Sequence, residues 1–163
     1  MDIRYIKPDD DRVAISRVYE ESWKYAYKGI LPQDYLDSIP AGHWCKALDT
    51  SGWNTLVMVE NCTIIGTSSF CASRFEDYAD YGEIVSIYLL PEYIGKGYGS
   101  RLFSASVNEL LKLGYHKLFL WVLEDNSRAR RFYEQQGFTA TENVLNGNIG
   151  GKESREIQYQ YLA

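Results

Sequence analysis

Three glycines, Gly95, Gly97 and Gly99, stand at alternate positions between an apolar run and a helical pattern. Glycine lets the backbone curl so that several amide groups face one point, and the positive end of a following helix favours an anion there. Lys96 and Ser100 can add a charge and a hydroxyl. The stretch therefore predicts a phosphate or pyrophosphate site, with a glycine turn that binds nothing as an equally open interpretation.

Two other phosphate-binding patterns fit this stretch poorly. A dinucleotide fingerprint that starts at Gly95 would need glycine or alanine where Ser100 stands. A kinase-type loop needs the string GxxxxGK followed by serine or threonine, which the chain does not contain. A small nicotinamide-dependent protein is therefore a weaker interpretation, and the glycines alone do not say which molecule carries the phosphate.

The glycine stretch follows a predicted strand and opens a predicted helix. We expect a strand over 3–7 and then helical segments up to residue 49. Apolar runs predict strands over 54–60, 63–73, 83–90 and 116–123, helical spacing predicts helices over 99–113 and 126–136, and a closing hairpin is expected over 138–145 and 154–162 with its turn over 146–151. The sequence thus predicts one mixed α/β domain over residues 1–163.

Composition and charge exclude several classes of function. The 163 residues are 45% apolar and carry a net charge of −5, which predicts a folded domain with its own core. The acidic balance argues against nucleic-acid binding, which needs clustered lysine and arginine. Without a signal-peptide pattern or a long apolar run, we expect a cytoplasmic protein that does not contact membranes. The three cysteines form no CxxC pair, so we expect reduced thiols and no metal site.

Two stretches together are similar to motifs of the GNAT family of acetyl-CoA-dependent N-acetyltransferases. The stretch SIYLLPEYIGKGYGSRLF resembles motif A of the family, in which Gly97 and Gly99 match the required small residues and Ile94 replaces a glutamine or arginine. The stretch EDNSRARRFYEQQGF resembles motif B, in which Asn126 opens a helix and Tyr133 follows an aromatic residue. Ile94 removes a side chain but no amide, so we expect the phosphate cradle to survive the replacement.

The resemblance, which is sharpest over residues 83–138, implies the GNAT fold. This is an α/β fold with a central mixed, mostly antiparallel sheet of about seven strands flanked by helices, splayed between the Glu83–Leu90 and His116–Leu123 strands. Acetyl-CoA would be the cosubstrate, with its pantetheine arm along the splayed strand and its pyrophosphate on the glycine loop. The cofactor-binding residues that the resemblance implies are Tyr88, Leu89, Leu90, Gly95, Lys96, Gly97, Tyr98, Gly99, Ser100, Asn126 and Tyr133.

The same resemblance implies two catalytic residues. Tyr133 resembles the general acid that protonates the departing thiolate, and a phenol with a pKa of about 10 suits that task; packing of the helix against the sheet is the alternative. Glu83 resembles a glutamate that acts as general base for the amine in one branch of the family, and a solvated strand end is its alternative. Asp77 and Asp80 are weaker candidates for the base.

The implied reaction is acetyl transfer to a primary amine by direct attack in a ternary complex. A non-catalytic acyl-CoA-binding sensor or partner module of the same fold is the alternative. The acceptor is expected to be a small molecule or a peptide, and a homodimer is compatible with the resemblance. Three aromatic residues, Tyr25, Tyr27 and Trp44, either line the acceptor pocket or pack in the core. We expect structural roles for the two histidines, His43 and His116.

Overall fold

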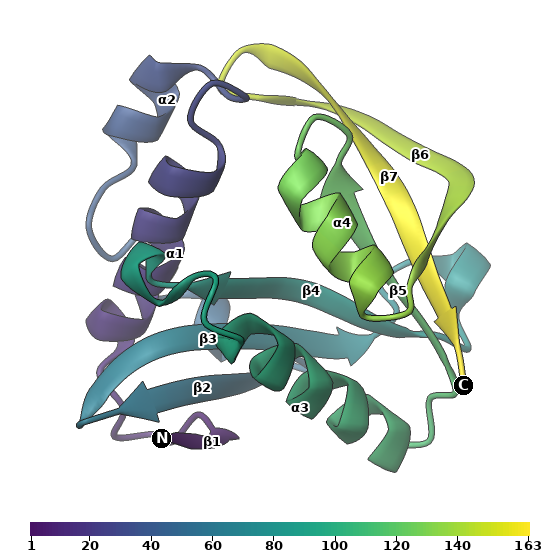
Figure 1. Cartoon of the computed structure of the whole chain (residues 1–163), viewed down its shortest axis with the longest axis horizontal. Helices are drawn as coiled ribbons and strands as arrows, with labels where there is room; N and C mark the ends of the chain where they lie inside the picture. The colour runs from purple at the N-terminus through teal and green to yellow at the C-terminus, as the bar shows by residue number, and fades with distance from the viewer.

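Seven strands form one sheet in the order β1-β2-β3-β4-β5-β7-β6, in a computed structural model that describes all residues from Met1 to Ala163 (Figure 1). The strands are β1 (Asp2–Tyr5), β2 (Asn54–Glu60), β3 (Thr63–Ala72), β4 (Gly82–Leu89), β5 (Lys117–Leu123), β6 (Thr139–Ile149) and β7 (Lys152–Leu162). Every neighbouring pair is antiparallel except β4 and β5, which run parallel. This confirms the fold predicted from the sequence, a mixed but mostly antiparallel sheet of seven strands.

Four α-helices flank this sheet. They are α1 (Arg12–Ala26), α2 (Gln33–Ser38), α3 (Tyr98–Lys112) and α4 (Ser127–Gln135), and three short 3-10 helices lie at Ala47–Asp49, Glu76–Tyr78 and Pro91–Tyr93. Asp11 caps α1 by accepting hydrogen bonds from the amides of Val13 and Ala14. No helix has both the length and the apolar character needed to cross a membrane.

The helices cover opposite faces of the sheet. On β2, the neighbouring side chains Val57 and Met58 point to opposite faces. Val57 packs with Ile15 and Tyr19 of α1, whereas Met58 joins the main core cluster that includes Leu102 of α3. We call the first side the α1 face and the second the α3 face; in Figure 1, α3 and α4 lie in front of the sheet.

The parallel pair β4–β5 separates after only two residue pairs. Gly82 is opposite Leu118 and Glu83 is opposite Phe119, and no further pairs follow. On the other edge of β4, the register with β3 skips Val85, which makes this residue a β-bulge directly after the last parallel pair. A bulge bends its strand and increases the local twist. The predicted splay is therefore confirmed, and the bulge gives it a physical cause.

Two turns that join antiparallel strands differ in how well the sequence predicts them. The predicted strands over 54–60 and 63–73 leave only Asn61 and Cys62 between them. These two residues form the turn from β2 to β3, with positive φ values of 48° and 64°. The last hairpin turns only at Gly150 and Gly151, both with positive φ, so its strands extend further than the expected turn over 146–151. Two consecutive glycines suit a two-residue turn that needs positive φ twice. The longer hairpin reaches the α1–α2 connection, where Lys152 Nζ donates to the Ile30 carbonyl at 2.6 Å.

Gly66 on β3 is a point where the core excludes even a methyl group. A Cβ there would lie 2.6 Å from Leu89 Cδ2 and 3.3 Å from the Tyr88 carbonyl oxygen. We expect Gly66→Ala to lower the free energy of unfolding by about 1–3 kcal/mol through overpacking, measured by urea denaturation. The matched control is Gly147→Ala, another strand glycine without positive φ, which meets only the Ser154 hydroxyl at 3.3 Å. Equal stabilities of the two variants would contradict this packing argument.

Candidate active site

The glycine stretch forms a turn that leads directly into α3. Gly95 and Gly97 have φ values of 79° and 82°, the left-handed region that glycine adopts without strain. Gly97 is the residue before the first turn of α3, and no side chain caps this helix. No atom lies within 4 Å of the position where a Cβ of Gly95 or Gly97 would stand. The turn is therefore exposed, and its shape depends on glycine.

The backbone amides of this turn are all free. None of the six N–H groups from Gly95 to Ser100 donates a hydrogen bond to another part of the chain. Unsatisfied amides at a helix N-terminus, together with the positive end of the helix dipole, form an anion site. The residues present therefore fit a pyrophosphate group, in the place where the sequence predicted one.

The side chains of the loop are largely engaged elsewhere. Lys96 Nζ lies 5.6 Å from the centre of the Tyr93 ring, and the Tyr98 hydroxyl donates to Glu60 Oε1 at 3.0 Å. The Ser100 hydroxyl accepts from Gln136 Nε2 at 3.1 Å, which links α3 to the end of α4. Ile94, at the position of the family's glutamine or arginine, packs against the main core cluster. A phosphate bound here would therefore be held mainly by backbone amides and by the Lys96 charge.

The backbone edge of β4 that faces the splay is unpaired beyond Glu83. The amide of Leu90 donates to the Ile65 carbonyl at 2.9 Å and is thus engaged with β3. Because backbone groups alternate in direction along a strand, Leu89 and Ile87 turn theirs away from β3. The Leu89 carbonyl accepts from the Ser22 hydroxyl at 2.5 Å, whereas the Leu89 amide remains available. Of the three predicted residues, Leu89 best exposes a backbone donor, and Ile87 is an addition that the motif did not indicate.

Gly99 joins the loop, β4 and α4 at one point. A Cβ on Gly99 would lie 3.6 Å from both Leu89 Cδ1 and Phe132 Cε2. Asn126, before the first turn of α4, accepts from the Ala129 amide at 3.2 Å and thereby caps that helix. The two motifs of the sequence are therefore adjacent in space, and Asn126 positions the start of the helix that carries Tyr133.

Tyr133 lies on α4 with its ring against Phe103, at a centroid distance of 5.6 Å. Its hydroxyl makes no hydrogen bond within the chain, although the ring is half-buried against the main core cluster. Burial raises the pKa of the Tyr133 phenol well above its usual value, and the nearby Tyr88 phenol raises it further. The phenol therefore keeps its proton at neutral pH. Packing explains the position of the Tyr133 ring, but the Tyr133 hydroxyl has no hydrogen-bond partner within the chain.

An aromatic cluster from α1, β4 and the loop before β2 lies close to Tyr133. Trp23 Nε1 donates to the Tyr88 hydroxyl at 3.1 Å, and the Trp23 ring lies 4.8 Å from Tyr27 and 5.3 Å from Trp44. Burial raises the pKa of the Tyr27 phenol, with a further contribution from Tyr133. Tyr27 and Trp44 thus pack in one aromatic cluster, and Tyr27 is the member shown to lie near Tyr133. Tyr25 is exposed and lies below the Arg128 guanidinium.

Glu83 is almost completely buried, with 1% of its side chain exposed, and forms an ion pair with Arg74. The Arg74 guanidinium donates to both carboxylate oxygens, at 2.5 Å and 3.1 Å, and the Arg74 amide donates at 3.1 Å. Arg74 also stacks at 5.4 Å over the Trp53 ring. This geometry places Glu83 at the start of the splay, and its role as a base stays a prediction.

The weaker base candidates lie away from this centre. Asp80 forms an exposed ion pair with Lys117 at 2.7 Å, and Asp77 is exposed in the short helix Glu76–Tyr78. His43 stacks edge-on against Trp44 at 4.6 Å, and His116 is exposed before β5. No hydrogen bond, ion pair or ring contact joins any of these four side chains to Glu83, Tyr88 or Tyr133.

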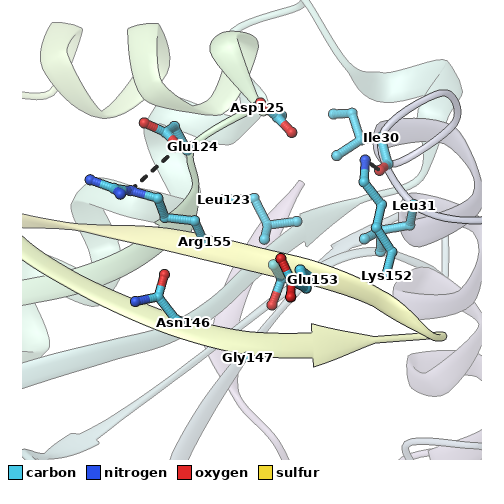
Figure 2. A pocket seen from close by; sticks show the side chains of 11 residues that line it. Ile30, Leu31, Leu123, Glu124, Asp125, Asn146, Gly147, Lys152, Glu153 and Arg155 are labelled. Atoms are coloured by element: carbon cyan, nitrogen blue, oxygen red, sulfur yellow. Dashed lines mark hydrogen bonds and ion pairs between the residues drawn. The ribbon is translucent and has the colours of Figure 1, made fainter.

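A cavity of about 650 Å³ opens where the α1–α2 connection, the end of β5 and the β6–β7 hairpin meet (Figure 2). Figure 2 shows Leu123 on its floor, with Glu124 paired to Arg155 at 3.5 Å on one side and Lys152 bound to Ile30 on the other. Asp125 and Glu153 line it without an ion pair. Charged side chains of both signs line the cavity, which lies on the side of the N-terminal helices and the final hairpin.

The family model described as "Acetyltransferase (GNAT) family" matches residues 15–138. The chain therefore belongs to the acetyltransferase (GNAT) family. This confirms three predictions from the sequence: the family, its fold and the enzyme class, an acetyl-CoA-dependent acyltransferase.

Individual relatives agree with this assignment. The chain is 32% identical over 119 residues to the L-methionine sulfoximine/L-methionine sulfone acetyltransferase of Salmonella typhimurium, covering 73% of this chain and 68% of that protein. It is 25% identical over 162 residues to the L-amino acid N-acyltransferase MnaT of Escherichia coli, covering 99% and 92%. The structure of yncA, a putative acetyltransferase from Salmonella typhimurium with its cofactor acetyl-CoA, superposes with a TM-score of 0.71 at 25% identity, covering 99% and 92%.

The buried ion pair gives a stability prediction. Arg74→Met leaves the buried Glu83 carboxylate without its positively charged partner, so we expect a loss of about 3 kcal/mol in the free energy of unfolding. Adding Glu83→Leu to Arg74→Met should recover most of the loss, because an apolar pair removes the unpaired charge. The control Arg155→Met, which breaks the exposed pair with Glu124, should cost less than about 1 kcal/mol. Urea denaturation of the four proteins measures this, and no recovery in the double variant would contradict the argument.

Proposed function

We propose that this chain transfers the acetyl group of acetyl-CoA to a primary amine by direct attack in a ternary complex. The observation that carries the proposal is that three features adjoin β4: the free amides at the start of α3, where Gly99 contacts Leu89; the unpaired edge of β4 itself; and the free hydroxyl of Tyr133, which lies near Tyr88. Acyl transfer from a thioester needs a held donor, an aligned amine and a proton for the departing sulfur. The free amides and the edge of β4 would hold the donor, and the Tyr133 hydroxyl would supply the proton. The cavity described above is the candidate site for the amine.

The cosubstrate supplies the thioester, and the chain's backbone would hold it. The amides of Gly95 to Ser100 suit the pyrophosphate, and the outward backbone groups of Ile87 and Leu89 suit an extended amide-containing arm that pairs with a strand edge. The predicted contribution of Lys96 is charge, since its ammonium is exposed beside the turn.

Tyr133 is our proposed general acid. Its phenol stays protonated at neutral pH because burial raises its pKa, and no group of the chain competes for its hydroxyl. The same burial that raises the phenol pKa also disfavours a charged thiolate, so the departing sulfur becomes a stronger base than in water, where a thiol titrates near 8.5, and can take the phenol proton.

Glu83 is proposed to assist deprotonation of the amine, as the sequence indicated. Because Arg74 donates to both of its oxygens, Glu83 acts as one unit with Arg74 in this arrangement. It would accept a proton itself only when Arg74 moves away.

The acceptor is proposed to be a small primary amine, with amino acids as the first class to test. Two relatives are named for L-methionine derivatives and for L-amino acids, which supports this choice. The experiment incubates the protein with acetyl-CoA and a panel of L-amino acids, L-methionine sulfoximine, diamines and peptides, and follows the release of free thiol. Acetyl-CoA binding without thiol release on any amine would indicate a binding module and would contradict the proposal.

Removal of the Tyr133 hydroxyl should slow turnover without weakening the binding of acetyl-CoA. We expect Tyr133→Phe to lower kcat by about 10²-fold or more, while the Kd for acetyl-CoA measured by calorimetry stays within about twofold. The matched control is Tyr161→Phe, another half-buried tyrosine whose hydroxyl makes no hydrogen bond and whose ring stacks on Phe138. Equal kcat values in the two variants would rule out the acid role of Tyr133.

The amide cradle can be tested at Gly97. A side chain at φ of +82° costs about 1–2 kcal/mol and distorts the turn, so we expect Gly97→Ala to weaken acetyl-CoA binding at least about 10-fold. Gly52→Ala is the matched control, because Gly52 has the same φ of +82° and also has no atom near its missing Cβ. Both variants should lose similar stability. Equal Kd values for acetyl-CoA would exclude Gly97 from the binding site.

A further inference from the structure

One carboxylate near the splay has no partner in the chain, and no sequence motif contains it. Glu156 lies on β7, opposite Leu123 of β5 and Leu145 of β6. It is half-buried and forms neither an ion pair nor a hydrogen bond. Glu83, by contrast, is saturated by Arg74.

The direction of the Glu156 side chain follows from its neighbours on β7. Ile157 packs against the main core cluster, and the Tyr159 hydroxyl bonds to Arg130 and Glu134 of α4. Since side chains alternate along a strand, Glu156 points to the opposite side, the α1 face. Its register partner Leu123 packs there with Leu31, Leu36 and Ile39. Glu156 and Glu83 therefore lie on the same face of the sheet.

Two charged or titratable groups from other elements act on Glu156, namely Arg74 and Tyr27. Burial raises the pKa of the Glu156 carboxyl, and the positive charge of Arg74, from the segment after β3, partly lowers it. The Tyr27 phenol at the end of α1 is close enough for Glu156 to raise its pKa, and Tyr133 also contributes to the raised pKa of Tyr27. On its own strand, Arg155 is already paired with Glu124. Glu156 therefore lies within electrostatic reach of Arg74 and of Tyr27, and Tyr27 in turn lies near Tyr133.

The same face carries two further polar atoms without partners. Trp121 Nε1 and Gln158 Nε2 are buried and make no hydrogen bond, and these two residues are register partners on β5 and β7. The 650 Å³ cavity adjoins this region, since Leu123, Ser154 and Arg155 line it. Buried polar groups without partners carry a free-energy cost. Both atoms are N–H donors, so they suit an oxygen of a polar acceptor, while the Glu156 carboxylate beside them suits its ammonium group.

We propose that Glu156 binds the ammonium group of the acceptor and takes its proton. The inference rests on the proposed acetyl transfer and names the group that receives the amine. The ammonium R–NH₃⁺ gives one proton to the Glu156 carboxylate and becomes R–NH₂. The amine lone pair forms the C–N bond as the C–S bond breaks, Tyr133 donates its proton to the sulfur, and the second nitrogen proton restores the phenol. Glu156 releases its proton to water.

The test compares Glu156→Gln with Glu142→Gln, an exposed glutamate on β6 without a hydrogen bond. With the amine of highest kcat/KM from the panel, Glu156→Gln should lower kcat/KM by about 10²-fold at pH 7. The loss should shrink as the pH rises toward 9.5, because more of the amine then arrives already deprotonated. The Kd for acetyl-CoA should not change. Wild-type turnover tests the proposed function separately.

A stability measurement distinguishes this role from a structural one. An acid whose pKa is raised on folding destabilises the protein above the pKa of the unfolded chain and has no effect below it. Glu156→Gln should therefore raise the melting temperature at pH 7 and leave it unchanged near pH 4. Loss of activity together with gain of stability is the expected result.

Three outcomes would overturn the proposal. One is a kcat/KM for Glu156→Gln equal to that of Glu142→Gln. Another is a pH-dependent loss found in Glu83→Gln and absent from Glu156→Gln, which would assign the proton to Glu83. The third is a lower melting temperature of Glu156→Gln at pH 7 with weakened acetyl-CoA binding, which would assign Glu156 a structural role. If Glu156→Gln does not fold, Glu156→Asp supplies the same comparison, because it keeps the charge on a side chain that is one methylene shorter.

Discussion

The separation of β4 from β5 is the constraint on which the rest of the structure depends. The two strands pair only at Gly82–Leu118 and Glu83–Phe119, and the bulge at Val85 bends β4 away immediately afterwards. A strand edge inside a sheet normally has all of its hydrogen bonds satisfied, so an unpaired inner edge carries a cost that the fold must offset. Here α3 and α4 pack into the α3 side of the gap, with Phe103 against Phe132 and Phe138. This packing holds the edge open and brings the glycine turn beside it.

The fold places its unsatisfied polar groups in one region. The six amides from Gly95 to Ser100, the Leu89 amide, the Tyr133 hydroxyl and the Glu156 carboxylate all lack partners. Several other polar groups beneath the surface are paired: Ser16 with Glu20, Ser106 with Ser68, and Tyr19 with Ser69 and Ser86. These free donors and acceptors are available to a bound molecule, and their concentration around the splay supports the place that we propose for the substrates.

The sequence predicts the parts of this site that are local in the chain. The glycine turn, the helix that follows it and the Asn126 cap each depend on residues within one or two turns of one another, so spacing reveals them. The sequence places the end of β4 one residue too late. Leu90 has an extended backbone because it precedes Pro91, so the apolar pattern continues through it, although β4 ends at Leu89. The Arg74–Glu83 pair and Glu156 could not be predicted. The first depends on a loop that folds back on its own strand, and the second on the register of β7 against β5.

Glu83 and Glu156 illustrate how burial and pairing distinguish a carboxylate with a structural role from one that is free to react. Both lie on the α1 face, and both are withdrawn from water to some degree. Arg74 offsets the desolvation of Glu83, so that carboxylate stabilises the fold while its lone pairs are engaged. Glu156 receives only the distant influence of the same guanidinium, and its pKa rises. A carboxylate that the fold leaves uncompensated binds a cation more readily and accepts a proton more readily, and an acceptor ammonium provides both.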